Sequence, residues 1–361
     1  MIIGLAISLT SILLLPFFIK KVEHNLEVFL FIMGLITTII TGVISTDLLV
    51  HILHNEMLYF ITLAVLIAGI IFKFTVDDIA NGVEKAAQRI HLSVFLFFII
   101  CVLGIISSII TAIIASLILA EVAKALPIER KYKVRFCIIT CFSIGLGAAL
   151  TPIGEPLSTI VISLLKEDFF FLAKTIGIYI LPGIIVLGLI GAVNIGANAK
   201  IIYKSQMKRE AREYNCPISA ETYPVILIRA LKIFLFVVAL ELLGAGFRPM
   251  MDLYILHLDS VALYWINMGS AVLDNATIAA AEISPKMESE QIKAILMGLL
   301  ISGGMLIPGN IPNIITACKL NIGSKDWAKF GVPLGLAFLI IYFIVLFLIQ
   351  PVGSFVNGIS I

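Results

Sequence analysis

The sequence predicts an all-α membrane protein that crosses the bilayer several times and carries interrupted helices in two related halves. Apolar residues make up 60% of the 361 positions and charged residues only 13%, and the mean hydropathy is +1.12. A soluble globular domain usually carries about 25% charged residues. Apolar runs long enough to cross a bilayer, roughly 20 residues, recur along the chain. This composition excludes a soluble enzyme, and no nucleic-acid partner is expected.

Several of the apolar runs are uninterrupted and predict simple membrane spans. The first begins at Met1 without a basic segment or a small-residue cleavage site, so it is interpreted as a span and not as a signal peptide. The uninterrupted runs cover residues 2–19, 27–44, 57–73, 171–195, 225–245 and 328–350.

The remaining apolar runs are broken by Gly, Pro and polar residues. We interpret residues 92–120 and 253–284 as re-entrant hairpins, which turn near Gly104–Thr111 and Ser270–Thr277. Residues 134–166 and 290–320 are interpreted as discontinuous spans, because Pro and Gly interrupt a helix ladder. The prediction is therefore about eight spans and two hairpins.

The distribution of basic residues supports this topology. Twenty of the 25 Lys and Arg residues fall in loops on one predicted face, including the basic loop 196–224. Cytoplasmic loops of membrane proteins carry an excess of Lys and Arg. We therefore expect this face to lie on the cytoplasmic side of the cell (plasma) membrane, with both termini outside.

The interrupted runs also predict an inverted repeat. Shifting the chain by 156 residues aligns Gly147, Leu150, Pro152 and Pro156 with Gly303, Leu306, Pro308 and Pro312. The order of span, hairpin, broken span and span occurs at 57–195 and again at 225–350, after N-terminal scaffold spans in 1–56. Each unit crosses an odd number of times, so the second is inverted. Gly and Pro interruptions at matching places in two halves indicate a transporter binding site.

The first broken span offers the clearest candidate site. Pro152 and Pro156 bracket Gly154 and Glu155, so this stretch is not regular helix. Its freed carbonyl groups, together with the hydroxyl groups of Thr151, Ser158 and Thr159, are oxygen ligands that hard cations prefer. The alternative is a proline kink in which Glu155 merely begins a helix.

The second hairpin offers another acid at membrane depth. Asp274 and Asn275 lie in an apolar stretch with Ser270 and Thr277, and a carboxylate there costs at least ~2.5 kcal/mol. They are either helix caps, direct cation ligands, or both. Two acids in one low-dielectric pocket would suit alternate binding of a proton and a metal cation, with Glu155 and Asp274 as ligands of the transported ion.

Uncharged polar groups surround these acids in the prediction. Gly303, Gly304, Asn310 and Asn313 provide carbonyl and amide groups in the second broken span, as a supporting wall. The His and Cys residues show no spacing typical of a metal site or of a nucleophile with its base. No enzymatic activity and no cofactor are therefore expected.

Three short motifs resemble those of a known transporter family. Thr151-Pro-Ile-Gly-Glu-Pro-Leu-Ser-Thr159 is similar to the break "GGA-x-TPIGD-x-TTT" of NhaD-type sodium/proton antiporters, with Glu155 in place of Asp. Ser270-Ala-Val-Leu-Asp-Asn275 resembles their "S-A-x-x-D-N" hairpin tip, and Gly303-Gly-Met-Leu-Ile their "GG-S-x-L-I". The resemblance covers roughly residues 90–350. It implies membership of the ion transporter superfamily, as a homodimer with a fixed scaffold and a mobile, elevator-like transport domain.

The residues and the resemblance together favour secondary active transport. The leading hypothesis is exchange of Na⁺ or another small inorganic cation for protons at Glu155 and Asp274. The alternative is sodium-coupled uptake of a small organic or inorganic anion, held by Ser and Asn side chains at helix N-termini.

Overall fold

The computed structural model is built of helices, and the predicted all-α class is confirmed for the residues that it describes. The description covers residues 1–349 apart from 20–21, 23–24, 55–57, 60–61, 64–65, 68, 72, 75–90, 200–221, 251–252, 254–255 and 272–274. Asp274 and residues 200–221 of the predicted basic loop therefore lie outside the described residues.

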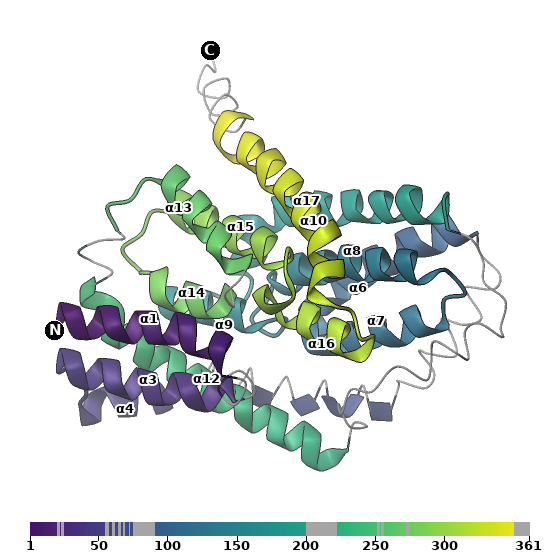
Figure 1. The fold of residues 1–361 in the computed structure, drawn as a ribbon. Coiled ribbons are helices and arrows are strands. Elements are labelled where there is room, and N and C mark those ends of the chain that lie inside the picture. The colour runs from purple at the N-terminus through teal and green to yellow at the C-terminus, as the bar shows by residue number, and fades with distance from the viewer. Residues whose placement is uncertain are drawn as a thin grey trace.

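The helices of residues 2–53 and the long helix of residues 223–250 form one layer, seen along the lower side of Figure 1. The long helix α12 packs along α3, and α1 lies beside both. Ser45 caps the short helix α4 by accepting a hydrogen bond from the backbone N–H of Leu48. The layer consists of α1 (Ile2–Phe18), α3 (Leu26–Thr41), α4 (Thr46–Leu53) and α12 (Tyr223–Met250).

The first half of the core contains one tight helix-to-helix turn and one wider break. Helix α6 continues through the expected turn region and ends only at Ile110, so Thr111 alone separates it from α7. Between α8 and α9 the chain is non-helical until Pro156, which is the first residue of α9. The elements are α6 (Leu92–Ile110), α7 (Ala112–Ala125), α8 (Arg130–Ala148), α9 (Pro156–Leu165) and α10 (Phe171–Gly191), with the π-turn η1 (Ala192–Gly196).

The second half follows the same order of elements. A short helix and a 3₁₀ turn lead to α14, and a broken segment then separates α15 from α16. The elements are α13 (Ser260–Ile266), η4 (Asn267–Ala271), α14 (Asn275–Glu282), α15 (Ser289–Gly303), η5 (Ile307–Gly309), α16 (Ile311–Lys319), α17 (Ser324–Phe343) and the π-turn η6 (Ile344–Ile349).

The two halves pack against each other in a reciprocal way. Helix α14 of the second half packs on α9 of the first, and α7 of the first packs on α16 of the second. The Tyr342 hydroxyl of α17 donates a hydrogen bond to the carbonyl of Tyr179 in α10 at 2.7 Å. The halves therefore share one core, with the ends of the short helices at its centre.

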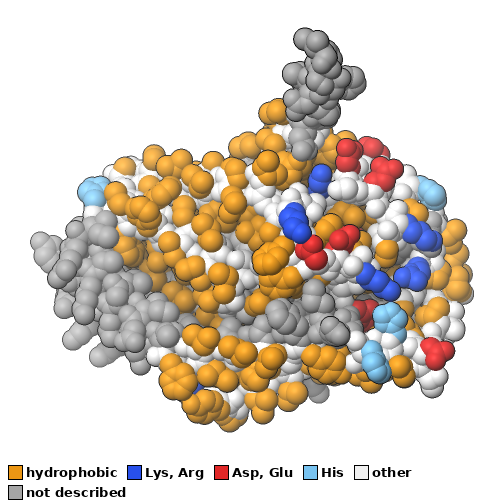
Figure 2. Space-filling view, turned by 180° about the vertical axis from the view of Figure 1, so that it is seen from behind, with side chains coloured by type: hydrophobic (Ala, Val, Ile, Leu, Met, Phe, Trp, Pro, Cys, Tyr) orange, Lys and Arg blue, Asp and Glu red, His pale blue; other side chains and the backbone are white. Residues whose placement is uncertain are grey.

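Long apolar helices and an apolar surface support a multi-pass membrane protein. Within the described residues, helices Leu92–Ile110, Phe171–Gly196 and Ser324–Ile349 are long and apolar enough to cross a membrane. Ile178 and Val193, on the second of these, are 72% and 68% exposed, which suits lipid contact. Figure 2 shows hydrophobic side chains over much of one face, with most charged side chains gathered toward one side.

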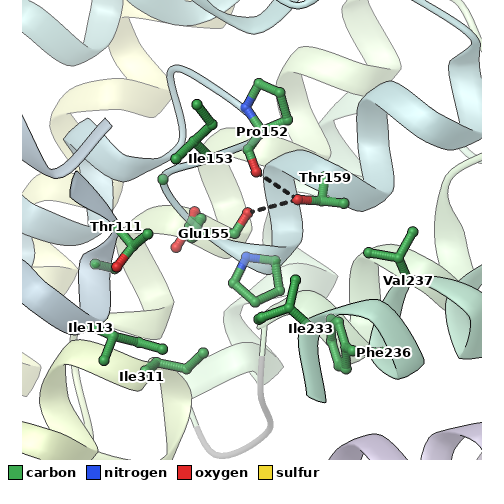
Figure 3. A pocket seen from close by; sticks show the side chains of 13 residues that line it. Thr111, Ile113, Pro152, Ile153, Glu155, Thr159, Ile233, Phe236, Val237 and Ile311 are labelled. Carbon is green, nitrogen blue, oxygen red and sulfur yellow. Dashed lines mark hydrogen bonds between the residues drawn. The ribbon is translucent and has the colours of Figure 1, made fainter. Parts of the chain in front are cut away.

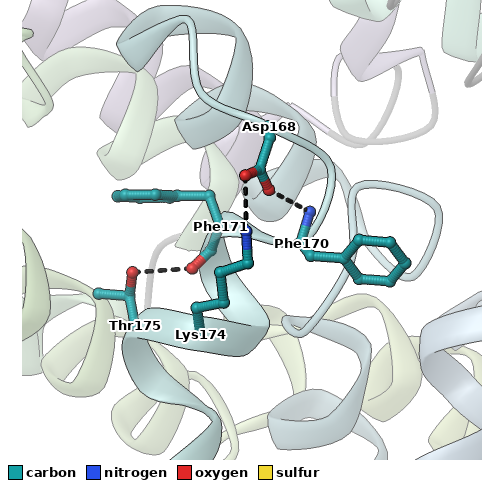
Figure 4. A network of polar contacts seen from close by, with 5 residues as sticks. All are labelled: Asp168, Phe170, Phe171, Lys174 and Thr175. Carbon is teal, nitrogen blue, oxygen red and sulfur yellow. Dashed lines mark hydrogen bonds and ion pairs between the residues drawn. The ribbon is translucent and has the colours of Figure 1, made fainter.

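A polar loop joins α9 to α10 at an exposed end. The Asp168 carboxylate accepts hydrogen bonds from the Lys174 ammonium at 2.7 Å and from the Phe170 N–H at 2.8 Å (Figure 4). The hydrogen bond from Lys174 is the main cause that lowers the pKa of Asp168. Lys166, with φ of 57°, ends α9 in the left-handed region and turns the chain into this loop.

Candidate functional site

Glu155 occupies the N-cap position of α9, at the end of the break that follows α8. Its backbone is extended, with φ −152° and ψ 159°, and its side chain does not cap its own helix. Pro156 at the first helical position fits this start, because proline lacks the N–H that a helix N-terminus leaves unbonded anyway. The side chain of Glu155 is only 4% exposed. The sequence thus places an ionisable group in the protein interior.

The break before Glu155 is held in shape by hydrogen bonds. The Thr159 hydroxyl donates to the carbonyl of Pro152 at 2.7 Å. A Cβ atom on residue 154 would lie 2.7 Å from the carbonyl carbon of Ala148, so only glycine fits at Gly154. The break is therefore an ordered turn and not a simple kink.

The turn between α6 and α7 packs directly on this break. The backbone N–H of Ala112 donates to the carbonyl of Gly154 at 2.7 Å, and the Thr151 hydroxyl donates to the carbonyl of Ser108. Thr111 adopts φ 78° and ψ 149°, a region that a β-branched residue rarely enters. Such backbone strain persists where the surrounding structure enforces it, and it gathers at functional sites.

A small cavity of about 30 Å³ lies beside Glu155. A water molecule needs roughly 10–15 Å³, so the cavity has room for about two or three water-sized particles. Figure 3 shows Glu155 between the turn at Thr111 on one side and helix α12 on the other. The described lining residues are Thr111, Ala112, Ile113, Pro152, Ile153, Gly154, Glu155, Pro156, Thr159, Ile233, Phe236, Val237 and Ile311.

The break in the second half repeats this local geometry with an amide in place of the acid. Asn310 is the N-cap of α16, with φ −154° and ψ 146°, and it also makes no capping hydrogen bond with its side chain. Asn313 closes the break by donating to the carbonyl groups of Gly303 at 2.9 Å and Leu306 at 2.8 Å. The indole N–H of Trp327 donates to the carbonyl of Gly304 at 3.3 Å.

The end of η4 and the start of α14 pack on the second break. The Ser270 hydroxyl lies 2.8 Å from the hydroxyl of Ser302 and 3.0 Å from the carbonyl of Leu299. Asn275 begins α14 and is 3% exposed. Its amide nitrogen lies 3.6 Å from the ideal Cβ position of Gly303. Asp274 and the side chain of Thr277 lie outside the described residues, so their predicted roles stay predictions.

The two breaks approach each other at the centre of the core. The Asn310 amide nitrogen lies 2.5 Å from the ideal Cβ position of Gly145 on α8, so this side chain reaches across to the first half. Ile311, the next residue, lines the Glu155 cavity. The N-termini of α7, α9, α14 and α16 all lie at these turns and breaks, and a helix N-terminus carries partial positive charge.

Several buried polar atoms around the breaks lack a hydrogen-bond partner among the described residues: Ser158 Oγ, Asn275 Nδ2, Asn310 Nδ2 and Asn313 Oδ1. Most buried polar atoms in proteins are hydrogen-bonded. An amide offers a donor on one edge and an acceptor on the other, so these groups can bind either a cation or an anion. Four such atoms around two breaks that pack together are typical of a ligand site.

A transition-metal centre is not supported by the described part of the chain, where no three His, Cys, Asp or Glu side chains gather. A cation beside Glu155 would be held by one carboxylate together with hydroxyl and carbonyl oxygens. That ligand set suits a hard cation.

Of the predicted site residues, the cavity brings together Pro152, Gly154, Glu155, Pro156 and Thr159. Ser270, Asn275, Asn310 and Asn313 lie around the second break and are not among the described lining residues. Sequence reasoning placed Thr111 at the turn of the predicted first hairpin but did not include it among the site residues, and it did not select the α12 residues. The sole signal for Thr111 is its place as a polar residue between two apolar helices. Ile233, Phe236 and Val237 carry none, because an apolar span facing lipid has the same composition.

Comparison with known proteins gives one family. A family model described as "Protein of unknown function (DUF1646)" matches residues 2–349. No curated protein matches the chain. The resemblance to sodium/proton antiporters therefore stays a prediction. Because the match covers nearly the whole sequence, the chain belongs to the DUF1646 family.

Proposed function

We propose that the protein is a secondary active transporter that exchanges a small cation, Na⁺ in the first instance, for protons at Glu155. The observation that carries this proposal is a carboxylate only 4% exposed, at a helix break beside a cavity. Ionisable groups are costly inside a membrane, and those that occur usually mark ion pathways or proton relays. A proton and a cation would compete for the same carboxylate, which is the chemical requirement for exchange.

The architecture behind the proposal is a pair of inverted repeats. In this scheme α6–α7 and α13–α14 are re-entrant hairpins, while α8–α9 and α15–α16 are broken spans. Two observations support it: the reciprocal packing of α14 on α9 and of α7 on α16, and the matching N-cap geometry of Glu155 and Asn310. Asp274 would supply the second acid.

Alternating access requires the site to change the side from which it is reached. We propose that the core carrying Glu155 moves against the layer of α1, α3 and α12, in a homodimer in the cell membrane with both termini outside. The support is that Ile233, Phe236 and Val237 of α12 form one wall of the cavity, while the polar lining residues Thr111, Glu155 and Thr159 belong to the core. In this scheme the break lies at the boundary between the two parts.

The test measures cation-dependent collapse of a pH gradient in everted membrane vesicles. Wild-type protein is expected to move protons when Na⁺ is added, and Glu155→Gln and Asp274→Asn are expected to abolish this response. Glu155→Asp, which keeps the charge, should retain part of it. Full Na⁺-dependent activity in both neutral variants would contradict the assignment.

A second candidate is sodium-coupled uptake of a small anion. It is favoured by the amide nitrogens of Asn275 and Asn310, which lack partners among the described residues and lie at helix N-termini. Donors in that position are suited to carboxylate or phosphate groups. Uptake of a labelled dicarboxylate or of phosphate into proteoliposomes, driven by a Na⁺ gradient, distinguishes this candidate from exchange.

A further inference from the structure

The cavity beside Glu155 has two chemically different walls. The core wall carries its polar groups, which are the Glu155 carboxylate, the hydroxyls of Thr111 and Thr159, and the backbone of the break. The α12 wall consists of Ile233, Phe236 and Val237 and presents hydrocarbon only. Phe236 and Val237 are 5% and 2% exposed. Ligands therefore come from one wall, and the other wall limits the space.

The size of the cavity restricts what can stand beside the carboxylate. About 30 Å³ accommodates an ion that has lost most of its water, but no polyatomic organic ion with its own hydration. Glu155 is the sole ionisable side chain among the described lining residues, so this part of the lining provides one negative charge. Nothing on the α12 wall can replace the hydration shell of an ion.

We infer that Phe236, with Ile233 beside it, is the size filter of the Glu155 site and restricts its cargo to a monatomic cation or a proton. This inference rests on the proposed function. It assigns a role in cation selectivity to a side chain that does not itself coordinate the cation. Apolar pocket walls discriminate by volume, and each methylene is worth roughly 10–200-fold between competing substrates. Truncation of the ring should therefore admit larger cations while the ligands stay in place.

The same helix offers a matched control. Phe234 precedes Phe236 by two positions and contacts Tyr59, with ring centroids 5.9 Å apart. It is not among the described lining residues. Phe234→Ala removes the same atoms from the same helix without enlarging the cavity, so it separates a pocket effect from a general loss of packing.

The experiment uses purified full-length protein in proteoliposomes and records proton movement in response to Na⁺, K⁺, guanidinium and tetramethylammonium. Guanidinium and tetramethylammonium keep their charge at neutral pH and so do not carry protons by themselves. Wild type is expected to respond to monatomic cations only. Phe236→Ala should raise the guanidinium response relative to Na⁺ by at least roughly tenfold, Phe236→Leu by less, and Phe234→Ala not at all.

The outcomes separate the two proposals. A wild type that moves no protons with any cation overturns the proposed exchange and the size filter with it. A wild type that exchanges Na⁺, together with unchanged selectivity in Phe236→Ala and Phe236→Leu, overturns the size filter alone. The filter also fails if Phe234→Ala admits guanidinium as well as Phe236→Ala does. Phe236→Leu keeps the test decisive if the alanine variant does not fold.

Discussion

The two faces of helix α12 differ in how they meet their neighbours. Toward α3 the contact is close: the ideal Cβ position of Gly34 lies 2.8 Å from Leu242 Cβ and 3.0 Å from the carbonyl of Ala239. An ion pair between Lys232 and Glu27, at 3.3 Å, joins the same two helices. Small residues at a membrane helix interface let the backbones approach and pack tightly.

Toward α9 the contact of α12 is less extensive. Glu241 accepts a hydrogen bond from the Ser163 hydroxyl at 2.5 Å, and the Leu164 side chain lies over Gly244, 2.5 Å from its ideal Cβ position. The Glu155 cavity lies further along the same interface.

This difference indicates which interface can separate. Closely packed helix backbones lose their contacts when the two helices slide, because these contacts depend on the register between the helices. The α9 interface, with a hydrogen bond, a side chain over a glycine and a cavity, loses less contact when its helices slide. We therefore expect α3 and α12 to move as one unit, with α9 and the core moving against them.

The largest expected difference is in exchange activity, between cross-linking α9 to α12 and cross-linking α3 to α12. In a background with the five native cysteines replaced by serine, Leu164→Cys with Gly244→Cys joins α9 to α12. Glu27→Cys with Lys232→Cys, at the positions of the ion pair, joins α3 to α12 through a short thiol-reactive bridging reagent. The cross-link, formed by oxidation in the first pair, should abolish exchange in that pair and leave it unchanged in the second, as measured in proteoliposomes.

Reduction of the first pair should restore exchange, which serves as its internal control. Exchange that survives complete cross-linking of α9 to α12 would show that this interface does not need to move. A loss of exchange on joining α3 to α12 would show that the supposed scaffold moves too.

The next largest effect is expected from overpacking the interface between α3 and α12. Gly34→Ala places a methyl group against Leu242 and the α12 backbone, and such overpacking typically costs about 1–3 kcal/mol. The free energy of unfolding in mixed detergent micelles measures it. Gly177→Ala on α10 is the control, because its nearest neighbour is Leu150 Cδ2 at 3.7 Å. Equal stability of Gly34→Ala and wild type would contradict the close packing from which we infer that α3 and α12 move as one unit.

Removal of the hydrogen bond between α9 and α12 should have a smaller effect on the free energy of unfolding. Hydrogen bonds between membrane helices contribute about 0.6 kcal/mol on average and at most about 1.7 kcal/mol. Ser163→Ala, which removes the donor to Glu241, should lower the free energy of unfolding by this amount. A loss larger than that of Gly34→Ala would reverse the proposed order of the two interfaces.

The smallest effect is expected at the exposed loop between α9 and α10. Lys174 and Asp168 pair at 2.7 Å with side chains 68% and 58% exposed, and exposed pairs contribute little. The pKa of Asp168 is lowered, so any contribution is present at neutral pH and is lost on acidification through that lowered pKa. The melting temperature of Lys174→Ala at neutral pH should match wild type; a clear decrease would mean that this loop anchors α10.

Local sequence features predict much of the fold and the acidic half of the site. The breaks before Pro156 and Pro312 follow from the chemistry of proline, and the three apolar helices from composition alone. The turn at Thr111 could not be located as well, because no glycine or proline occupies it and tertiary contacts with Gly154 enforce its backbone.

The α12 wall could not be predicted at all. Ile233, Phe236 and Val237 belong to an apolar run in which core-facing and lipid-facing positions look alike, since both are hydrocarbon. Their contact with the Glu155 break joins segments about eighty residues apart and depends on how two layers pack. Likewise, the reach of Asn310 toward Gly145 is a long-range feature without a local signal.

Proton release on addition of Na⁺ to the purified protein in weakly buffered detergent solution tests the central claim most directly, because it reports binding without requiring movement. Choline chloride at the same ionic strength is the control. If Glu155 binds either a proton or the cation, wild type will release protons with Na⁺ and not with choline, and Glu155→Gln will release markedly fewer. Undiminished Na⁺-specific release from Glu155→Gln would contradict the account.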